Sequence, residues 1–184
     1  LGRFLKATDQ PVLIATKFFP LPWRFMKGAV PRALKGSLAR LGTESVDLYQ
    51  VHWPSVSMST DTLMEGMAEC VKSGLTRTVG VSNFGQSRML AAYSALARHN
   101  IPLASNQVHY SLLNRAVEKN GTLARCKELG IRLIAYSPLE KGLLSGKYSA
   151  TNPPPGSRAG NYANMLPKIQ PLIKTMTAIG QDHG

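Results

Sequence analysis

A chain of 184 residues is long enough to bury about 70% of the surface that its unfolded form would expose. Its hydrophobic content of 43% and charged content of 17% exclude an intrinsically disordered chain. No apolar run reaches the ~20 residues that a membrane-spanning helix needs, so we expect no membrane partner. The two cysteines, Cys70 and Cys126, are too few for a disulfide framework, which favours a reducing compartment.

The net charge is +12, from 22 basic and 10 acidic residues. Such a balance raises the question of nucleic-acid binding. The basic residues are dispersed among apolar ones, however, and no zinc-finger spacing or aromatic RNA-binding motif is present. We therefore expect a solvated basic surface and no nucleic-acid partner. An anionic small cofactor would suit the same charge.

Both ends of the chain lack the features of natural termini. It begins at Leu1 without a methionine, a signal peptide or a transit-like segment, and it stops at Gly184 just after an apolar-periodic segment. We interpret the chain as a fragment, whose sequence carries no information on targeting.

Short apolar runs alternate with amphipathic segments along the chain. The runs predict strands at residues 12–16, 46–52, 78–81, 104–108 and 131–136. The amphipathic segments predict helices at residues 30–41, 63–71, 89–98, 117–129 and 166–179. Thr62 and Glu65 fit a capping box at the second helix, and glycines at 42, 74 and 130 are placed to end helices. A Pro-rich loop is expected near residues 149–164, inside one domain that spans residues 1–184.

Strands that alternate with helices predict an α/β fold with a parallel sheet and right-handed crossovers. A doubly wound sheet and a (β/α)8 TIM barrel both fit this pattern. A complete barrel needs eight such units and about 250 residues. About five units, at ~30 residues each, therefore predict an incomplete barrel.

Each predicted strand ends in a hydrogen-bonding or ionisable side chain. In parallel α/β folds the chemistry lies at the carboxyl ends of the strands. Taken singly, each of these residues is ordinary turn or surface chemistry, but five in phase on one rim indicate a functional site. They are Lys17, His52, Ser82 with Asn83, Asn106 with Gln107, and Tyr136 with Ser137.

Other kinds of site lack their signatures. The segment 80–84 lacks the second glycine of a nucleophile elbow, and no Gly-rich phosphate motif follows the first strand. The four histidines show no ligand spacing, so we predict no metal site. His109, two residues beyond Gln107, is a weaker candidate for lining a pocket. Both cysteines fall on predicted helices and are expected to be inert packing residues.

These segments together resemble the aldo-keto reductase family across nearly the whole chain. The matching segments are IATK at 14–17, VDLYQVHWP at 46–54, GVSNF at 80–84, NQV at 106–108, AYSPL at 135–139 and KGLLSGKY at 141–148. The stretches 21–24 and 101–107 look most like plant and algal plastid members, which implies a chloroplast location, with the cytoplasm as the alternative.

The resemblance implies a (β/α)8 barrel that reduces a small-molecule aldehyde or ketone with NADPH. It places the family's catalytic Lys at Lys17 and its catalytic His at His52. The family's catalytic Tyr and Asp would precede Leu1, and its block for the adenosine 2′-phosphate would follow Gly184. The resemblance therefore implies a fragment with little or no activity.

The resemblance also implies the cofactor residues. Ser82, Asn83 and Gln107 would bind the nicotinamide carboxamide, whose one acceptor and two donors these side chains can match. Tyr136 would stack on the nicotinamide ring. Ser137, Leu139, Gly142, Leu143 and Lys147 would surround the pyrophosphate.

Several points stay open at this stage. A cofactor-binding regulatory subunit without turnover is the alternative to an enzyme, and a basic nucleic-acid binder is a third hypothesis. Trp23, Phe25, Trp53 and the loop after Tyr148 either line the substrate pocket or pack the barrel mouth. The substrate and the oligomeric state are not determined by the sequence.

Overall fold

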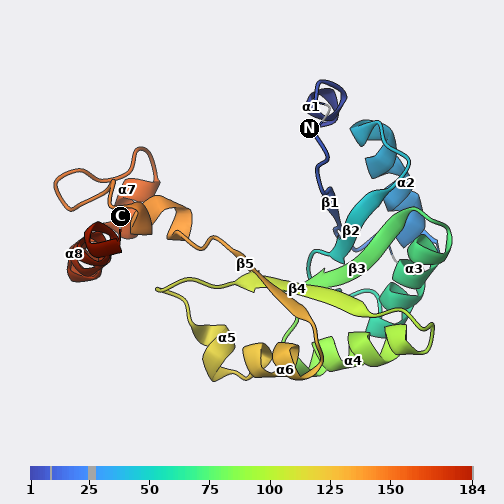
Figure 1. The fold of residues 1–184 in the computed structure, drawn as a ribbon. Helices are drawn as coiled ribbons and strands as arrows, with labels where there is room; N and C mark the ends of the chain where they lie inside the picture. Colours follow the sequence, from blue (N-terminus) through green and yellow to red (C-terminus); the bar gives the residue numbers. More distant parts are fainter. Residues whose placement is uncertain (9, 25–27, 184) are drawn as a thin grey trace. The chain divides into compact units, whose positions relative to one another are not determined.

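The computed structural model describes residues 1–8, 10–24 and 28–183, which are drawn in Figure 1. They form two compact units. The first comprises Leu1–His109 with Arg115–Tyr136, and the second comprises Tyr110–Asn114 with Ser137–Gly184.

The first unit is a five-stranded sheet in which every neighbouring pair of strands is parallel. Its strands lie in chain order: β1 (Ala15–Phe18), β2 (Val46–Val51), β3 (Thr76–Ser82), β4 (Leu103–His109) and β5 (Arg132–Tyr136). Its helices are α1 (Gly2–Lys6), α2 (Ala29–Leu41), α3 (Thr60–Lys72), α4 (Gln86–Ala97), α5 (Ala116–Lys119) and α6 (Thr122–Glu128).

The strand order separates the two architectures that the sequence allows. In a doubly wound sheet the strand order reverses and helices cover both faces, whereas a barrel keeps its strands in chain order with its helices outside. Here the order is sequential, and Figure 1 shows α2, α3, α4 and α6 along one face of the sheet. This arrangement is that of consecutive β/α units of a barrel, as the sequence predicts, and excludes the doubly wound alternative.

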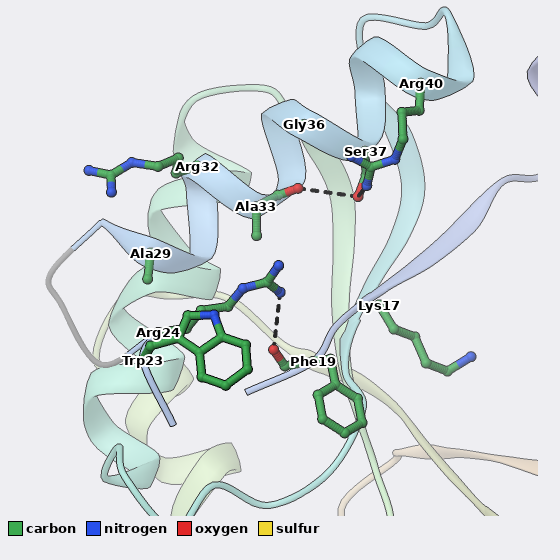
Figure 2. Close-up of a pocket in the computed structure, with 10 residues that line it drawn as sticks. All are labelled: Lys17, Phe19, Trp23, Arg24, Ala29, Arg32, Ala33, Gly36, Ser37 and Arg40. Carbon is green, nitrogen blue, oxygen red and sulfur yellow. Dashed lines mark hydrogen bonds between the residues drawn. The ribbon is translucent and has the colours of Figure 1, made fainter. Parts of the chain in front are cut away.

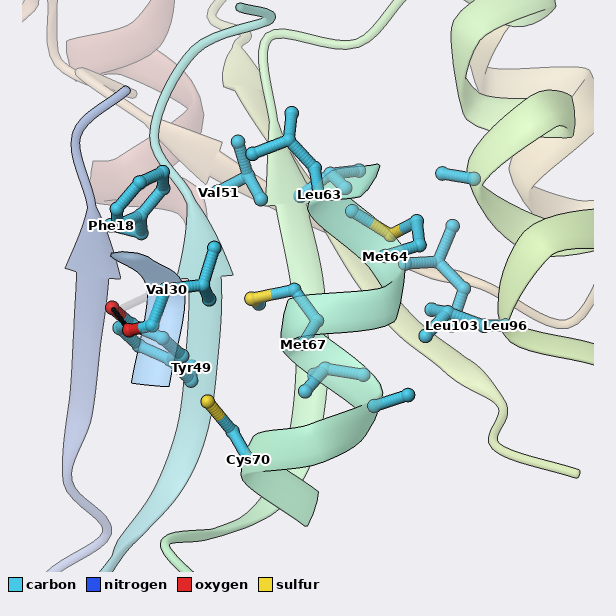
Figure 3. Close-up of a cluster of buried hydrophobic side chains, with 14 of the residues drawn as sticks. Phe18, Val30, Tyr49, Val51, Leu63, Met64, Met67, Cys70, Leu96 and Leu103 are labelled. Carbon is cyan, nitrogen blue, oxygen red and sulfur yellow. Dashed lines mark hydrogen bonds between the residues drawn. The ribbon is translucent and has the colours of Figure 1, made fainter. Parts of the chain in front are cut away.

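The main core lies between the sheet and these helices. Side chains that alternate along β1, β2 and β3 face the helices and are buried, among them Phe18, Tyr49 and Val51. In Figure 3 they face Leu63 and Met67 of α3. Burying one such side chain contributes about 1.5–3 kcal/mol, so this layer holds the helices on that face.

The opposite face of the strands carries polar residues in register. Lys17 pairs with Gln50, Gln50 with Gly80, and Gly80 with Ser105 across four strands. The Gln50 amide donates to the Ser105 hydroxyl at 3.2 Å. A Cβ on Gly80 would come within 2.3 Å of the Ser105 oxygen, so the glycine is needed for this close approach.

The first strand and the second helix begin elsewhere than the sequence predicts. β1 begins at Ala15 rather than at residue 12, and Leu13 is 86% exposed. The predicted capping box at Thr62 is wrong. Ser59 is the N-cap of α3, and its hydroxyl accepts a hydrogen bond from the Thr62 N–H at 3.1 Å.

The single helix predicted at residues 117–129 is also wrong. The chain forms α5 and α6 instead, with Gly121 between them at φ +76°. This left-handed conformation suits glycine and interrupts the helical hydrogen-bond pattern. Gly130 follows α6 at φ +66°, in agreement with its predicted role at a helix end.

The second unit is mainly helical. It contains the 3-10 segment η1 (Glu140–Ser145), α7 (Arg158–Tyr162) and α8 (Leu166–His183). Leu143, Leu166 and Ile169 are buried together in its own small core. The region predicted as a Pro-rich loop therefore contains a short helix, and the last helix extends four residues beyond its predicted end at residue 179.

Candidate functional site

Backbone and side-chain hydrogen bonds centred on Asn83 link the carboxyl ends of β2, β3, β4 and β5. Asn83 directly follows β3 with φ +62°, and its N–H donates to the Gln107 carbonyl at 2.9 Å. Its Nδ2 donates to the His52 carbonyl and to Ser82 Oγ, both at 3.1 Å. The Tyr136 hydroxyl donates to Asn83 Oδ1 at 3.0 Å. Four of the strand ends predicted to share one rim are thus joined through one residue.

Ser82 and Gln107 lie side by side in this network. They are register partners on β3 and β4, and Ser82, which is 1% exposed, donates from Oγ to the Gln107 carbonyl at 2.8 Å. The half-buried Gln107 side chain makes no hydrogen bond with any other residue that the structure describes. Its amide therefore offers both a donor and an acceptor at the rim.

Tyr136 is packed against a histidine as well as bonded to Asn83. His109 and Tyr136 are register partners on β4 and β5. Their rings are stacked with centroids 5.2 Å apart and an interplanar angle of 11°. His109, a weaker candidate from the sequence, therefore contacts the residue expected to form the stacking surface.

His52 follows β2 among aromatic rings. Its N–H donates to the Phe18 carbonyl at 2.8 Å, which fixes it beside the end of β1. Its imidazole meets Phe19 edge-on at 5.4 Å and stacks on Trp53 at 6.4 Å. Burial lowers the pKa of His52, and the Lys17 ammonium lowers it further. The imidazole is therefore neutral at neutral pH and keeps one N–H to donate.

Lys17 lies on β1 in the polar row of the sheet, as register partner of Gln50. It is half-buried, and within the described ranges it forms no salt bridge. Lys17 directly precedes Phe18, whose carbonyl accepts the His52 N–H at 2.8 Å, so the two residues lie at adjacent strand ends. The structure thus brings the two predicted catalytic residues into one neighbourhood.

A groove of about 450 Å³ lies beside this site, between the segment after β1 and α2. Small residues of α2, including Ala33 and Gly36, line it, and Trp23 and Arg24 close one end (Figure 2). Figure 2 also shows the Lys17 ammonium pointing away from α2. Lys17 and Phe19 also line this groove, so it adjoins the candidate site at the end of β1, whereas none of the residues hydrogen-bonded to Asn83 lines it.

Two of the three predicted aromatic pocket residues can be placed. Trp53 stacks on His52 at the rim, and Trp23 lines the groove against α2. Phe25 lies outside the described residues. Phe19, which the sequence analysis did not select, contacts His52 instead. Its position directly after β1, two residues beyond Lys17, was the signal, because residues two apart in extended chain share a face.

The remaining predicted cofactor residues belong to the second unit. Ser137 has φ +52°, and its carbonyl accepts from the Glu140 N–H at 2.9 Å. Gly142 has φ +97°. Leu139 and Lys147 are exposed, whereas Leu143 is buried in the small core, which leaves only its backbone to meet a ligand. The predicted cofactor set is therefore divided between the two units.

Asn106 does not share the site with its neighbour Gln107. Its side chain is fully buried and donates to the Phe84 carbonyl at 2.7 Å and to Met89 Sδ at 3.3 Å. Consecutive strand residues point to opposite faces, so only Gln107 reaches the rim. The pair predicted at this strand end thus contributes one site residue.

Within residues 1–8, 10–24 and 28–183, His, Cys, Asp and Glu form no group of three or more that could hold a metal ion. In the same ranges no helix combines the length and apolar character needed to cross a membrane.

Known proteins resemble this chain over its whole length. The sequence profile of the Aldo/keto reductase family matches residues 1–184. The chain is 37% identical over 193 residues to pyridoxal reductase, chloroplastic, from Arabidopsis thaliana, covering 100% of this chain and 53% of that protein. It is 34% identical over 143 residues to L-glyceraldehyde 3-phosphate reductase from Escherichia coli (strain K12), covering 78% of this chain and 41% of that protein.

Solved structures agree. The thermostable aldo-keto reductase Tm1743, crystallised with the inhibitor epalrestat, matches with a TM-score of 0.70 and 33% identity, over 78% of this chain and 54% of that one. An aldo-keto reductase from Klebsiella pneumoniae in complex with NADPH matches with a TM-score of 0.66 and 29% identity, over 77% of this chain and 48% of that one. The chain spans about half the length of the relatives it matches. It belongs to the Aldo/keto reductase family.

Proposed function

We propose that this chain supplies the nicotinamide-binding rim of an NADPH-dependent oxidoreductase that reduces aldehydes or ketones to alcohols. The observation that carries the proposal is the Asn83 network, which joins four consecutive strand ends through the side chains of Ser82, Asn83 and Tyr136 and the backbone carbonyls of His52 and Gln107. Family membership and the NADPH complex of the Klebsiella relative support the choice of cofactor.

The groups at the rim fit a carboxamide. Asn83 Oδ1 accepts from Tyr136 and keeps a second lone pair, while both Nδ2 hydrogens are engaged by His52 and Ser82. Asn83 can therefore only accept from the carboxamide N–H. The carboxamide oxygen then needs a donor, and the uncommitted Gln107 amide is suited to supply one. Ser82 already donates to Gln107 and acts mainly by fixing the other two.

The catalytic roles follow from charge and protonation. When bound, NADPH supplies the hydride that goes to the carbonyl carbon. Negative charge then develops on the carbonyl oxygen, and the neutral His52 imidazole donates a hydrogen bond to it. The Lys17 ammonium lowers the pKa of a phenol placed beside it, which makes that phenol a better proton donor at neutral pH.

The proton donor itself is the family's Tyr, which the resemblance assigns, with its Asp partner, to a loop before Leu1. Tyr49 cannot replace it. Its side chain is fully buried on the helix-facing side of the sheet, its hydroxyl donates to the Val30 carbonyl at 3.4 Å, and burial raises its pKa. We therefore propose that the 184-residue chain alone turns over little or no substrate.

We propose that the segment 137–147 of the second unit holds the cofactor pyrophosphate. Gly142, at φ +97°, allows the close backbone approach that a diphosphate needs. Leu143 would contribute its backbone, because its side chain is buried. Ser137 and the exposed Leu139 flank this turn, and the exposed Lys147 supplies a positive charge.

The relatives suggest which substrate and compartment to test first. The aromatic rings of Phe19 and Trp53 beside His52 suit a planar aromatic aldehyde, and the Arabidopsis relative is named a pyridoxal reductase. The same relative is chloroplastic, which supports a plastid location over the cytoplasmic alternative. Immunodetection in fractionated cells of the source organism tests the location: signal confined to the cytosol would contradict it.

Titration of the chain with NADPH and NADH, followed by fluorescence quenching, tests the proposal. We expect saturable binding that is tighter for NADPH. Gln107→Ala should weaken NADPH binding about three- to tenfold, the usual effect of one hydrogen bond. Gln10→Ala, at an exposed position, is the matched control. Absence of saturable binding, or a Gln107→Ala variant equal to the control, would contradict the proposal.

An activity assay distinguishes the enzyme from the non-catalytic regulatory subunit. With pyridoxal and NADPH, the 184-residue chain should show no reduction above background. A longer form that contains the family's Tyr and Asp should reduce the aldehyde. Tight NADPH binding without reduction in that longer form would favour the non-catalytic regulatory subunit.

A further inference from the structure

Tyr136 is held at the rim by two independent contacts. Its ring is stacked on His109 at 5.2 Å and 11°, and its hydroxyl donates to Asn83 Oδ1 at 3.0 Å. The stack fixes the plane of the ring, and the hydrogen bond fixes the direction of its hydroxyl within that plane. The first contact comes from β4 and the second from the residue after β3, so two different strand ends orient the ring.

The two faces of the Tyr136 ring therefore differ. His109 covers one face, and among the described residues no other ring contacts Tyr136. Aromatic rings prefer offset stacking at centroid distances of about 4.5–7 Å, and the His109 stack falls within this range. A flat ligand ring can then stack on Tyr136 only from the face opposite His109.

We propose that His109 is a positioning residue that backs Tyr136 and restricts nicotinamide stacking to the opposite face of its ring. The inference rests on the proposed cofactor function. His109 and Gln107 are two residues apart and lie on the same face of β4. One strand therefore carries both a ligand for the carboxamide and the support for the stacking ring, which keeps the two at a fixed spacing.

The geometry can be tested without cofactor. Ring currents from Tyr136 should shift the His109 ring-proton NMR signals upfield, and Tyr136→Leu should remove this shift. His99 is the control, because it is half-buried like His109 but stacks on no described aromatic ring, and it is hydrogen-bonded to Lys72 on α3 at 3.2 Å. Unshifted His109 signals in the wild-type chain would overturn the stack.

The functional role is tested by saturation-transfer NMR with NADP⁺. In His109→Gln, which keeps polarity but loses the ring, transfer to the nicotinamide protons should fall relative to the adenosine protons. Overall NADP⁺ affinity should weaken about two- to tenfold, as expected for loss of one aromatic stack. His109→Phe should restore the ratio, and His99→Gln should leave it unchanged.

The outcomes distinguish this inference from the proposed function. An equal fall at both ends of NADP⁺, or no rescue by His109→Phe, would mean that His109 is merely structural. An unchanged ratio in His109→Gln would overturn the positioning role alone. No transfer to any NADP⁺ proton in the wild-type chain would overturn the proposed function, and this role with it, while the cofactor-free test of the stack would still stand.

Discussion

Replacing Asn83 by glycine and by alanine separates its two contributions to the site. Glycine removes the three side-chain hydrogen bonds, to His52, Ser82 and Tyr136, but accepts the left-handed backbone at φ +62°. A net hydrogen bond contributes about 0.5–1.5 kcal/mol to stability, and Asn83 is half-buried. We therefore expect Asn83→Gly to lower the free energy of unfolding by about 2 kcal/mol. Alanine should lose a further ~1 kcal/mol, because a Cβ is disfavoured in this conformation.

Asn100 provides the matched control. It has φ +57°, is exposed, and makes no side-chain hydrogen bond with the residues that the structure describes. Asn100→Gly should leave stability nearly unchanged, and Asn100→Ala should lose only the backbone contribution. Urea denaturation at 25 °C measures all four variants. For a chain of this size, ~1 kcal/mol corresponds to about 2–4 °C in Tm.

The comparison has a clear refuting result. If Asn83→Gly is as stable as Asn100→Gly, the hydrogen bonds that join the strand ends do not hold the rim together. If Asn83→Ala and Asn83→Gly have the same free energy of unfolding, the backbone at residue 83 is not left-handed.

Three other predictions concern packing, charge and the thiols. Gly80→Ala should lower the free energy of unfolding in urea by about 1–3 kcal/mol, because its Cβ would approach a side-chain oxygen of β4 to 2.3 Å. Gly85→Ala, whose Cβ would have nothing within 4 Å, should lower it far less. Equal losses would contradict the close approach at Gly80. Because the pKa of His52 is lowered on folding, the unfolded chain takes up its proton first, and stability should fall as the pH drops below about 6.5. Lys17→Met should raise that pKa in an NMR titration, and an unchanged value would show that the two groups do not interact. Burial raises the pKa of Cys70 to about 12, so iodoacetamide at pH 8 should label it only after unfolding, and rapid labelling of the folded chain would refute its burial.

The alternation of strands and helices was predictable because it follows from local hydrophobic periodicity. The boundaries were less so. Val12 and Leu13 are as apolar as a buried strand, yet they are 49% and 86% exposed. Nothing in their own sequence shows whether a neighbour covers them. The break at Gly121 was readable, since the Asn-Gly pair at residues 120–121 is a turn signal that the apolar periodicity of the segment outweighed.

The site was predictable only as far as single strands determine it. The phase of the strand ends predicted that His52, Ser82 and Gln107 share one rim. Strict alternation of side chains along β4 would also have excluded Asn106 from the site. The contacts of Tyr136 with Asn83 and His109 depend on the register between β4 and β5 and on the turn after β3. That register is a property of the assembled sheet, so the residues alone do not reveal it.

The central claim, that the rim binds a nicotinamide carboxamide, is tested most directly by side-chain amide NMR. Nicotinamide mononucleotide is titrated into the ¹⁵N-labelled chain while the amide signals of Asn83, Gln107 and Asn106 are followed. We predict that Asn83 and Gln107 shift saturably with one common Kd, and that Asn106, which faces the helices, does not move. A Gln107 signal that stays fixed, or that moves no more than Asn106, would contradict the account.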